Sequence, residues 1–341
     1  MPISDLRDAF RGRLLEFAWS QWAQLGVSAH LTRSDRWVLD PEALIVFSVE
    51  LARRDPRLFD ELLDWISLNG RLLSLQRIRN LVTRFPVEQG LVDAVVAWVA
   101  DAAPAVRWPK AGRPAYEPKS NVEPLFTSDV VSFVGEQDPV FARYGYMRPR
   151  VRRSGKSVEP DARLPVNLAL RLRLFFGPGT RSEIVRVLLT STEGPLDAAR
   201  IADEAGFAKR NVNETLNALV ASGAAKARRS GNERRFVVVR DRWATFLEIG
   251  SAATDIPVFV SWVHFFPPLL KMLLWLEREA VSDDSDYLIS SRARDLVAQI
   301  SQDLETVGME IPRDRSRPGA AYLAAFEELV ASLPEAIADG V

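Results

Sequence analysis

The chain has 341 residues, of which 26% are charged, and a formal net charge of −1. It contains no cysteine, which excludes a disulfide framework and a thiolate metal site. Its length predicts two or three domains. No positively charged, apolar leader opens the sequence, so we expect a cytoplasmic protein.

Charge is distributed unevenly along the chain. Residues 143–242 contain 21 Lys and Arg against 10 Asp and Glu, a net charge of +11. Residues 243–341 contain 7 against 16, a net charge of −9. A surface that binds a polyanion is therefore expected in the middle of the chain.

Residues 1–103 are expected to form an N-terminal helical domain. Leu6, Phe10 and Leu14 recur at helical spacing, and Asp40-Pro41 is typical of a helix start, with proline at the first helical position. The domain is predicted to be all-α.

One helical pair in this region has two interpretations. The stretch RLFDELLDWISLNGRLLSLQRIRNLVTRF could be a degenerate helix-turn-helix, with Ser74 capping its second helix and Gln76, Arg77 and Arg79 pointing outward. The alternative, a plain helical hairpin, is the favoured one.

Residues 104–176 are expected to form a linker and a basic arm. The segment PAVRWPKAGRPAYEPKSNVEP has five prolines and little apolar periodicity, which indicates a linker or a long surface loop. The run from Arg148 to Lys156 then follows. It either contacts DNA through Arg150, Arg152 and Arg153, or it is a solvated loop.

Residues 177–245 contain two short helices in succession. Before them, Thr180 and Glu183 predict a capping box for a helix that begins at Thr180. Asp197 is a good N-cap for a helix that ends at about Ala205, and Gly206 breaks it. A second helix is predicted from about residue 208 to 222, with its apolar positions on one narrow stripe and Gly223 at its end.

A β-hairpin is expected directly after these helices. Residues 225–229 and 233–239 are strand-length runs, joined by Ser230-Gly231-Asn232, a turn rich in residues that tolerate positive φ. Four arginines flank this turn: Arg228, Arg229, Arg234 and Arg235.

The stretch IADEAGFAKRNVNETLNALVASGAAKARRSGNERRFVV resembles the core of ArsR- and MarR-type winged helix-turn-helix transcriptional regulators, over about residues 180–240. The resemblance implies that the second helix enters the major groove of double-stranded DNA and that the hairpin, or wing, contacts the backbone or minor groove. The expected fold is mostly α, with this domain between two all-α domains.

The resemblance also assigns roles to individual side chains. Base reading falls to Arg210, Asn211, Asn213 and Asn217, and phosphate contact to Lys209 and the four arginines of the wing. Glu214 departs from the expected pattern, since it places a negative charge on the reading face. It could accept a hydrogen bond from cytosine N4, or it could mark a winged helix that serves only protein packing.

Residues 246–341 are expected to form an acidic, all-α C-terminal domain. The stretch IPVFVSWVHFFPPLLKMLLWL approaches the length of a membrane span, but His264, Pro267, Pro268 and Lys271 interrupt it. A buried or dimer-forming helix is the preferred interpretation. Because residues 256–276 carry more apolar surface than a small helical domain normally buries, we expect a homodimer held by this domain.

No motif supports catalysis. The two histidines do not lie at metal-ligand spacing, and no GxSxG, GxGxxG or Walker sequence is present, so we expect neither enzymatic activity nor a metal or cofactor. The favoured function is a dimeric transcriptional regulator. The alternative is a protein-interaction module, such as a DNA-binding antitoxin that neutralises a toxin partner and autoregulates its operon, and a nucleic-acid-processing enzyme comes last.

Overall fold

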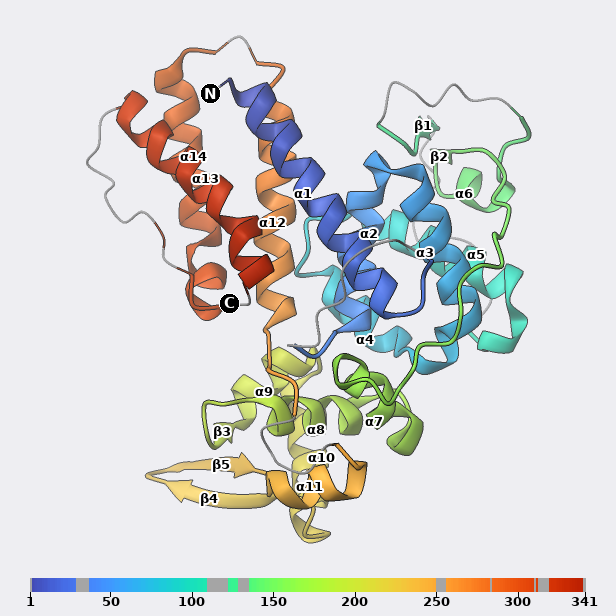
Figure 1. Cartoon of the computed structure of the whole chain (residues 1–341), viewed down its shortest axis with the longest axis vertical. Helices are drawn as coiled ribbons and strands as arrows, with labels where there is room; N and C mark the ends of the chain where they lie inside the picture. The colour runs from blue at the N-terminus through green and yellow to red at the C-terminus, as the bar shows by residue number, and fades with distance from the viewer. Residues whose placement is uncertain are drawn as a thin grey trace.

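The computed structural model describes residues 2–28, 37–108, 122–127, 135–249, 256–282, 284–309, 311 and 319–339. Within these ranges the protein is mostly α-helical. Two tiers stack along its long axis (Figure 1). We call the larger tier the helical body and the smaller one, residues 168–249, the helix–sheet unit.

The helical body combines elements from both ends of the chain. Its helices are α1 (Ile3–Gln24), α2 (Pro41–Leu51), α3 (Pro56–Asn69), α4 (Leu75–Val82), α5 (Gln89–Ala102), α6 (Pro139–Arg143), α12 (Trp262–Glu279), α13 (Asp286–Thr306) and α14 (Gly319–Asp339), with short 3₁₀ turns η1 (Ala52–Arg54), η2 (Gly70–Leu72) and η3 (Pro104–Val106). A two-residue parallel pair, β1 (Glu123–Pro124) and β2 (Tyr146–Met147), lies beside α6. One apolar core runs through all of these helices.

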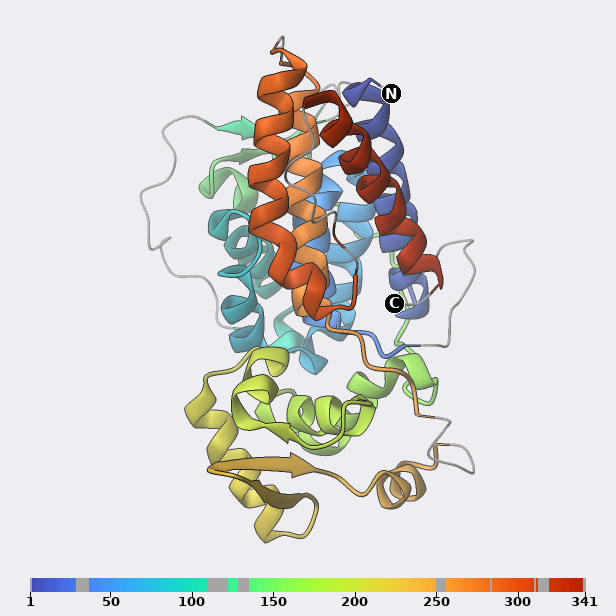
Figure 2. The ribbon, with the colours of Figure 1, turned by 90° about the vertical axis from the view of Figure 1, so that its left-hand side faces the viewer.

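Helix α12 lies inside this core. It packs against α1, α2 and α13, and the Phe266 ring stacks on Phe47 of α2 with ring centroids 4.5 Å apart. The apolar side chains of α12, which were expected from the sequence to hold a dimer together, are therefore buried within one chain. The C-terminal helices share their core with the N-terminal ones, which differs from the separate domain expected at 246–341 (Figure 2). None of the described helices is long and apolar enough to cross a membrane.

The helix–sheet unit has a second, smaller core of its own. The short turn η4 (Pro165–Asn167) leads into the unit, which comprises α7 (Leu168–Phe176), α8 (Thr180–Thr190), β3 (Leu196–Asp197), α9 (Ala198–Ala205), α10 (Lys209–Ala221), β4 (Lys226–Ser230), β5 (Glu233–Val237) and α11 (Arg240–Leu247). The three strands form an antiparallel sheet in the order β3-β5-β4. The predicted helix pair and hairpin are present.

Local signals explain the ends of these helices. The Asp197 carboxylate accepts from the backbone N–H groups of Ala199 and Arg200, as a helix N-cap should. Gly206 ends α9 with φ of +69°, and a Cβ at this position would lie 3.1 Å from a Leu81 methyl carbon. The positive φ favours glycine here, and a larger residue would also crowd the Leu81 side chain of α4.

Six buried ionic side chains join the two tiers. Arg77 of α4 donates to Asp40, and Arg173 of α7 donates to Glu42 and Glu183. Arg186 of α8 completes the group through Glu183 and Asp40. Three arginines face three carboxylates, so the cluster is neutral when all six are ionised, which offsets the cost of burying them.

Two expectations are corrected by this cluster. Arg77 does not point outward from a second helix-turn-helix, because its side chain is fully buried among carboxylates. Glu183 does not form a capping box with Thr180, because it pairs with Arg173 and Arg186, and the hydroxyl of Ser182 bonds the Gly179 backbone instead. Burial alone would raise the pKa of Glu183, but the nearby cations Arg77, Arg173 and Arg186 lower it.

Candidate nucleic-acid interface

Helix α10 is half buried. Val212, Leu216 and Leu219 form the buried stripe that the sequence predicts, and this stripe packs toward α8 and α9. Ala208 precedes the helix without a side-chain cap, so the first backbone N–H groups of α10 are left for another acceptor. A phosphate group is the kind of acceptor that a helix N-terminus binds.

The opposite face of α10 is exposed and polar. It presents all six side chains to which the sequence assigns DNA contact on this helix: Lys209, Arg210, Asn211, Asn213, Glu214 and Asn217. The Arg210 side chain is 88% exposed and forms an ion pair of 3.1 Å with Glu214, one turn away. In water such a pair contributes little stability, so both groups remain available to a ligand.

The hairpin brings its four arginines into two adjacent cross-strand pairs. Arg228 lies opposite Arg235, and Arg229 lies opposite Arg234. All four side chains are exposed. Like charges placed directly opposite each other destabilise a hairpin. Glu233 is 3.7 Å from Arg235 and offsets only part of this repulsion. An anionic ligand would offset the remainder.

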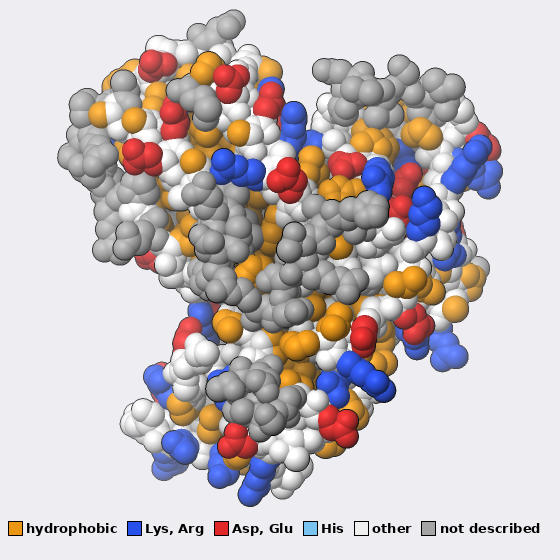
Figure 3. Space-filling view, viewed as in Figure 1, with side chains coloured by type: hydrophobic (Ala, Val, Ile, Leu, Met, Phe, Trp, Pro, Cys, Tyr) orange, Lys and Arg blue, Asp and Glu red, His pale blue; other side chains and the backbone are white. Residues whose placement is uncertain are grey.

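The strand pleat divides these arginines between two faces. Phe236 of β5 points into the core, so Arg234, two residues before it, lies on the same side as α10. Arg234 Nη1 donates to Asn217 Oδ1 at 3.1 Å. The hairpin and the exposed face of α10 therefore form one continuous surface, whereas Arg228 and Arg235 lie on the other face of the sheet. Figure 3 shows basic side chains gathered at this end of the molecule.

The helical body holds the start of α10 in place. Arg77 Nε donates to the carbonyl of Ala205 at 2.7 Å, and Asn80 Nδ2 donates to the carbonyl of Gly206 at 3.0 Å. Arg84 Nη2 lies 2.6 Å from Asp203 Oδ1. Helix α4 and Arg84, just beyond its end, thus hold the turn between α9 and α10 in place. No sequence pattern predicted that any of these three residues contacts the helix pair.

A second anchor comes from α12. His264 Nε2 lies 2.7 Å from Asp203 Oδ2, and Nδ1 lies 2.7 Å from Asp303 Oδ1 of α13. Burial alone would lower the pKa of His264, but the hydrogen bonds to these two carboxylates raise it to about 9. The hydrogen bond from His264 is also the main cause that lowers the pKa of Asp203 to about 2. The imidazole is therefore a cation at neutral pH.

The basic run from Arg148 to Lys156 lies away from this surface, along the helical body. Arg148 is buried over the rings of Phe59, Phe126 and Phe141. Arg150 pairs with Glu136 at 3.1 Å, and Arg153 pairs with Asp64 of α3 at 3.2 Å. Arg152 is exposed. The structure does not bring Arg150, Arg152 and Arg153 together with α10.

Elsewhere the described residues contain no group of three or more His, Asp and Glu side chains that could hold a metal ion. Residues 109–121, which include most of the expected proline-rich linker, lie outside the described residues. Comparisons of the chain with protein-family models, with curated proteins and with solved structures gave no match.

Proposed function

We propose that the helix–sheet unit is a winged helix that binds double-stranded DNA, with α10 as the recognition helix and the β4–β5 hairpin as the wing. One observation carries the proposal: the polar face of α10 and two arginines of the hairpin form a single exposed surface, joined by the Arg234–Asn217 hydrogen bond. The helical body contacts the unit at α7, α8 and the turn between α9 and α10, and the polar side chains of α10 remain exposed.

The chemistry of the surface suits duplex DNA. Arg210 and three asparagines lie on one helix face, and these side chains can form paired hydrogen bonds to guanine and adenine edges in the major groove. Arg229 and Arg234 lie beside them, where a recognition helix in the groove would bring the wing close to phosphates. We propose that the protein is a cytoplasmic transcriptional regulator and acts as a homodimer on a two-fold operator, because one recognition helix reads few base pairs.

The test begins with a duplex obtained by selection from random sequences with the full-length protein. Arg210→Ala should weaken binding to this duplex by about 1–3 kcal/mol and relax discrimination at one position, because a bidentate base contact is lost. Arg234→Ala should weaken binding to all duplexes alike and reduce the slope of log K against log salt by about 1. Fluorescence anisotropy over a salt series measures both quantities.

Two matched variants serve as controls. Arg235→Ala removes the same side chain from the opposite face of the same strand and should change the salt slope less than Arg234→Ala does. Glu214→Ala frees Arg210 from its ion pair. Stronger binding to every duplex would mean that the carboxylate only repels phosphate, and a loss confined to one sequence would mean that it reads cytosine. Failure to select any duplex, or unchanged binding in Arg210→Ala and Arg234→Ala, would overturn the proposal.

A further inference from the structure

A cleft opens at the end of the helical body that lies farthest from the helix–sheet unit (Figure 1). The first turn of α1, the last turn of α12, the start of α13 and the first half of α14 surround it. Its volume of about 540 Å³ is within the range of small-molecule sites, which is roughly 300–1,000 Å³. The proposed contact with DNA does not involve this end of the molecule.

The floor of the cleft is apolar. Leu6 of α1 and Ile289 of α13 are buried there, and Leu323 of α14 is a half-buried wall. The rings of Trp275 and Phe326 pack edge to face with centroids 4.9 Å apart, so they close the floor. An apolar chain laid over this floor would be removed from water without entering the core.

The rim of the cleft is acidic. Three carboxylates line it, and none of the described residues that line it is Lys, Arg or His: the acids are Glu279, Asp286 and Glu327. Glu279 is already neutralised, because Arg278 lies 3.0 Å and Arg292 2.5 Å from its two oxygens. Arg292 also pairs with Asp284 at 2.8 Å, so these four groups have no net charge. The negative charge of the rim therefore comes from the other two acids.

Asp286 is the acid most open to a ligand. It is the first residue of α13, it is exposed, and it has no ion-pair partner among the described residues. Glu327 of α14 adds a second carboxylate to the same rim. The N-terminal end of α13 carries roughly half a positive charge, which is less than the charge of these two carboxylates. A negative potential thus remains above the apolar floor.

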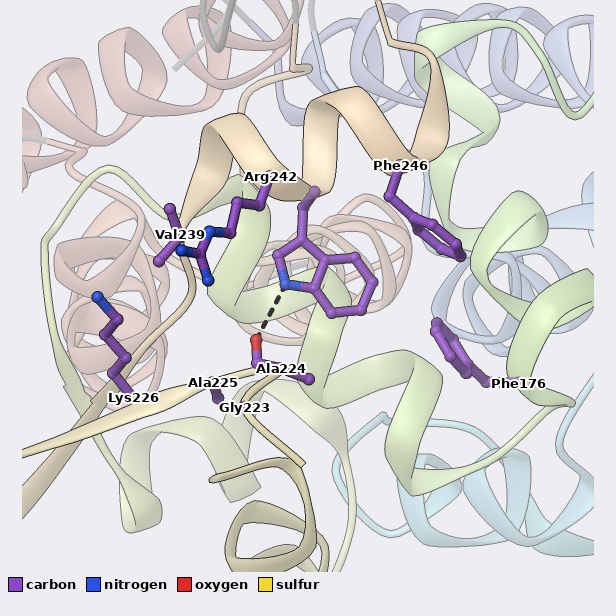
Figure 4. A pocket seen from close by; sticks show the side chains of 9 residues that line it. Phe176, Gly223, Ala224, Ala225, Lys226, Val239, Arg242 and Phe246 are labelled. Carbon is purple, nitrogen blue, oxygen red and sulfur yellow. Dashed lines mark hydrogen bonds between the residues drawn. The ribbon is translucent and has the colours of Figure 1, made fainter. Parts of the chain in front are cut away.

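Two other clefts of the described structure have cations at their edges. At the base of the hairpin, Lys226 and Arg242 line a cleft together with the buried Trp243 (Figure 4). The indole N–H donates to the carbonyl of Ala224 at 3.0 Å, and the ring packs against Phe246, so this cleft is filled by its own aromatic side chains. The groove between α12 and α13 is lined by three cations and one carboxylate: Lys271, Arg278, Arg292 and Asp295. The cleft at the end of the body differs from both in the sign of its charge.

We propose that this cleft binds an organic ammonium ion with an apolar chain, the ammonium at Asp286 and the chain over Leu323 and the apolar floor. The carboxylate selects a cation, and the floor selects an apolar chain over a metal ion, to which it offers no oxygen ligand. The site belongs to the helical body, so it goes beyond the proposed winged helix and does not depend on it.

The probe is 4-phenylbutylammonium, titrated into the full-length protein by calorimetry at pH 7. The alcohol 4-phenylbutanol and the anion 4-phenylbutyrate have nearly the same apolar chain with no charge and with the opposite charge. The ammonium ion should bind with a Kd of about 0.1–1 mM, about three- to tenfold more tightly than the alcohol. The anion should bind more weakly than the alcohol, because Asp286 and Glu327 repel it.

Three variants locate the site. Asp286→Asn keeps the shape of the side chain and should remove most of the preference for the ammonium ion, while the alcohol binds as before. Leu323→Gln should weaken the ammonium ion and the alcohol alike, because both lose the apolar wall. Asp295→Asn is the matched control, an exposed carboxylate on the same helix that lines the cationic groove, and should change neither.

Equal affinity for the three probes, tighter binding of the anion, or no binding at 5 mM would overturn the assignment. An unchanged preference for the ammonium ion in Asp286→Asn would overturn it as well, since the charge selection would then come from elsewhere. The titrations contain no DNA, so their outcome is independent of whether the helix–sheet unit binds a duplex.

Discussion

His264 connects three helices through a single ring, because its two nitrogens bond Asp203 of α9 and Asp303 of α13. Glu204 and Arg84 also lie in its electrostatic surroundings. The pKa of the imidazole is raised from an ordinary value of about 6.5 to about 9 on folding. Its contribution to stability is therefore fully present below pH 6.5 and is lost as the pH rises through 9.

We expect His264→Gln to lower the free energy of unfolding by about 1–2 kcal/mol at pH 6.5, with the difference from the native chain largely gone at pH 10. The magnitude is smaller than the full pKa difference implies, because Asp203 is 38% exposed and water screens the pair. Urea unfolding of the native chain and of His264→Gln at pH 6.5, 8 and 10 measures this difference in the free energy of unfolding. A difference independent of pH would show that the histidine stabilises only by packing.

At the scale of elements, the six buried ionic groups determine how α4, α7 and α8 meet. Arg77→Met should destabilise the protein by about 3–5 kcal/mol, because it leaves Asp40 and Glu42 buried with less compensation. Arg79→Met, on the exposed side of the same helix, is the matched control and should stay within about 0.5 kcal/mol of the native chain. Chemical denaturation compares them. Equal losses in both variants would refute a special role for the cluster.

At the scale of the whole molecule, α12 belongs to the same core as α1 and α2. Removal of residues 243–341 would expose Phe17 and Phe47, which contact α12 through Phe266. We expect a chain of residues 1–242 to lose cooperative unfolding and to aggregate, instead of remaining folded as a monomer. Thermal unfolding followed by circular dichroism, together with light scattering, tests this. A soluble fragment with one sharp transition would contradict it.

The sequence alone determined the local features of the candidate site. Asp197 caps α9, Gly206 ends it, and the apolar stripe of α10 is buried as its spacing predicts. The alternation along β5 places the neighbouring residues Arg234 and Arg235 on opposite faces of the hairpin. These features depend on residues within about two turns or two strands of each other, and short-range periodicity specifies which side of such an element is apolar.

Long-range packing determines which element covers each apolar face and which charges are buried. Arg77 and Arg79 are equivalent in a helical pattern, yet Arg77 is enclosed because Asp40, Glu183 and the carbonyl of Ala205 converge on it from distant parts of the chain. In the same way, the apolar run at 256–276 meets α1 and α2 of its own chain. Periodicity specifies an apolar face but not the partner that covers it, because the partner is set by long-range packing of the complete chain.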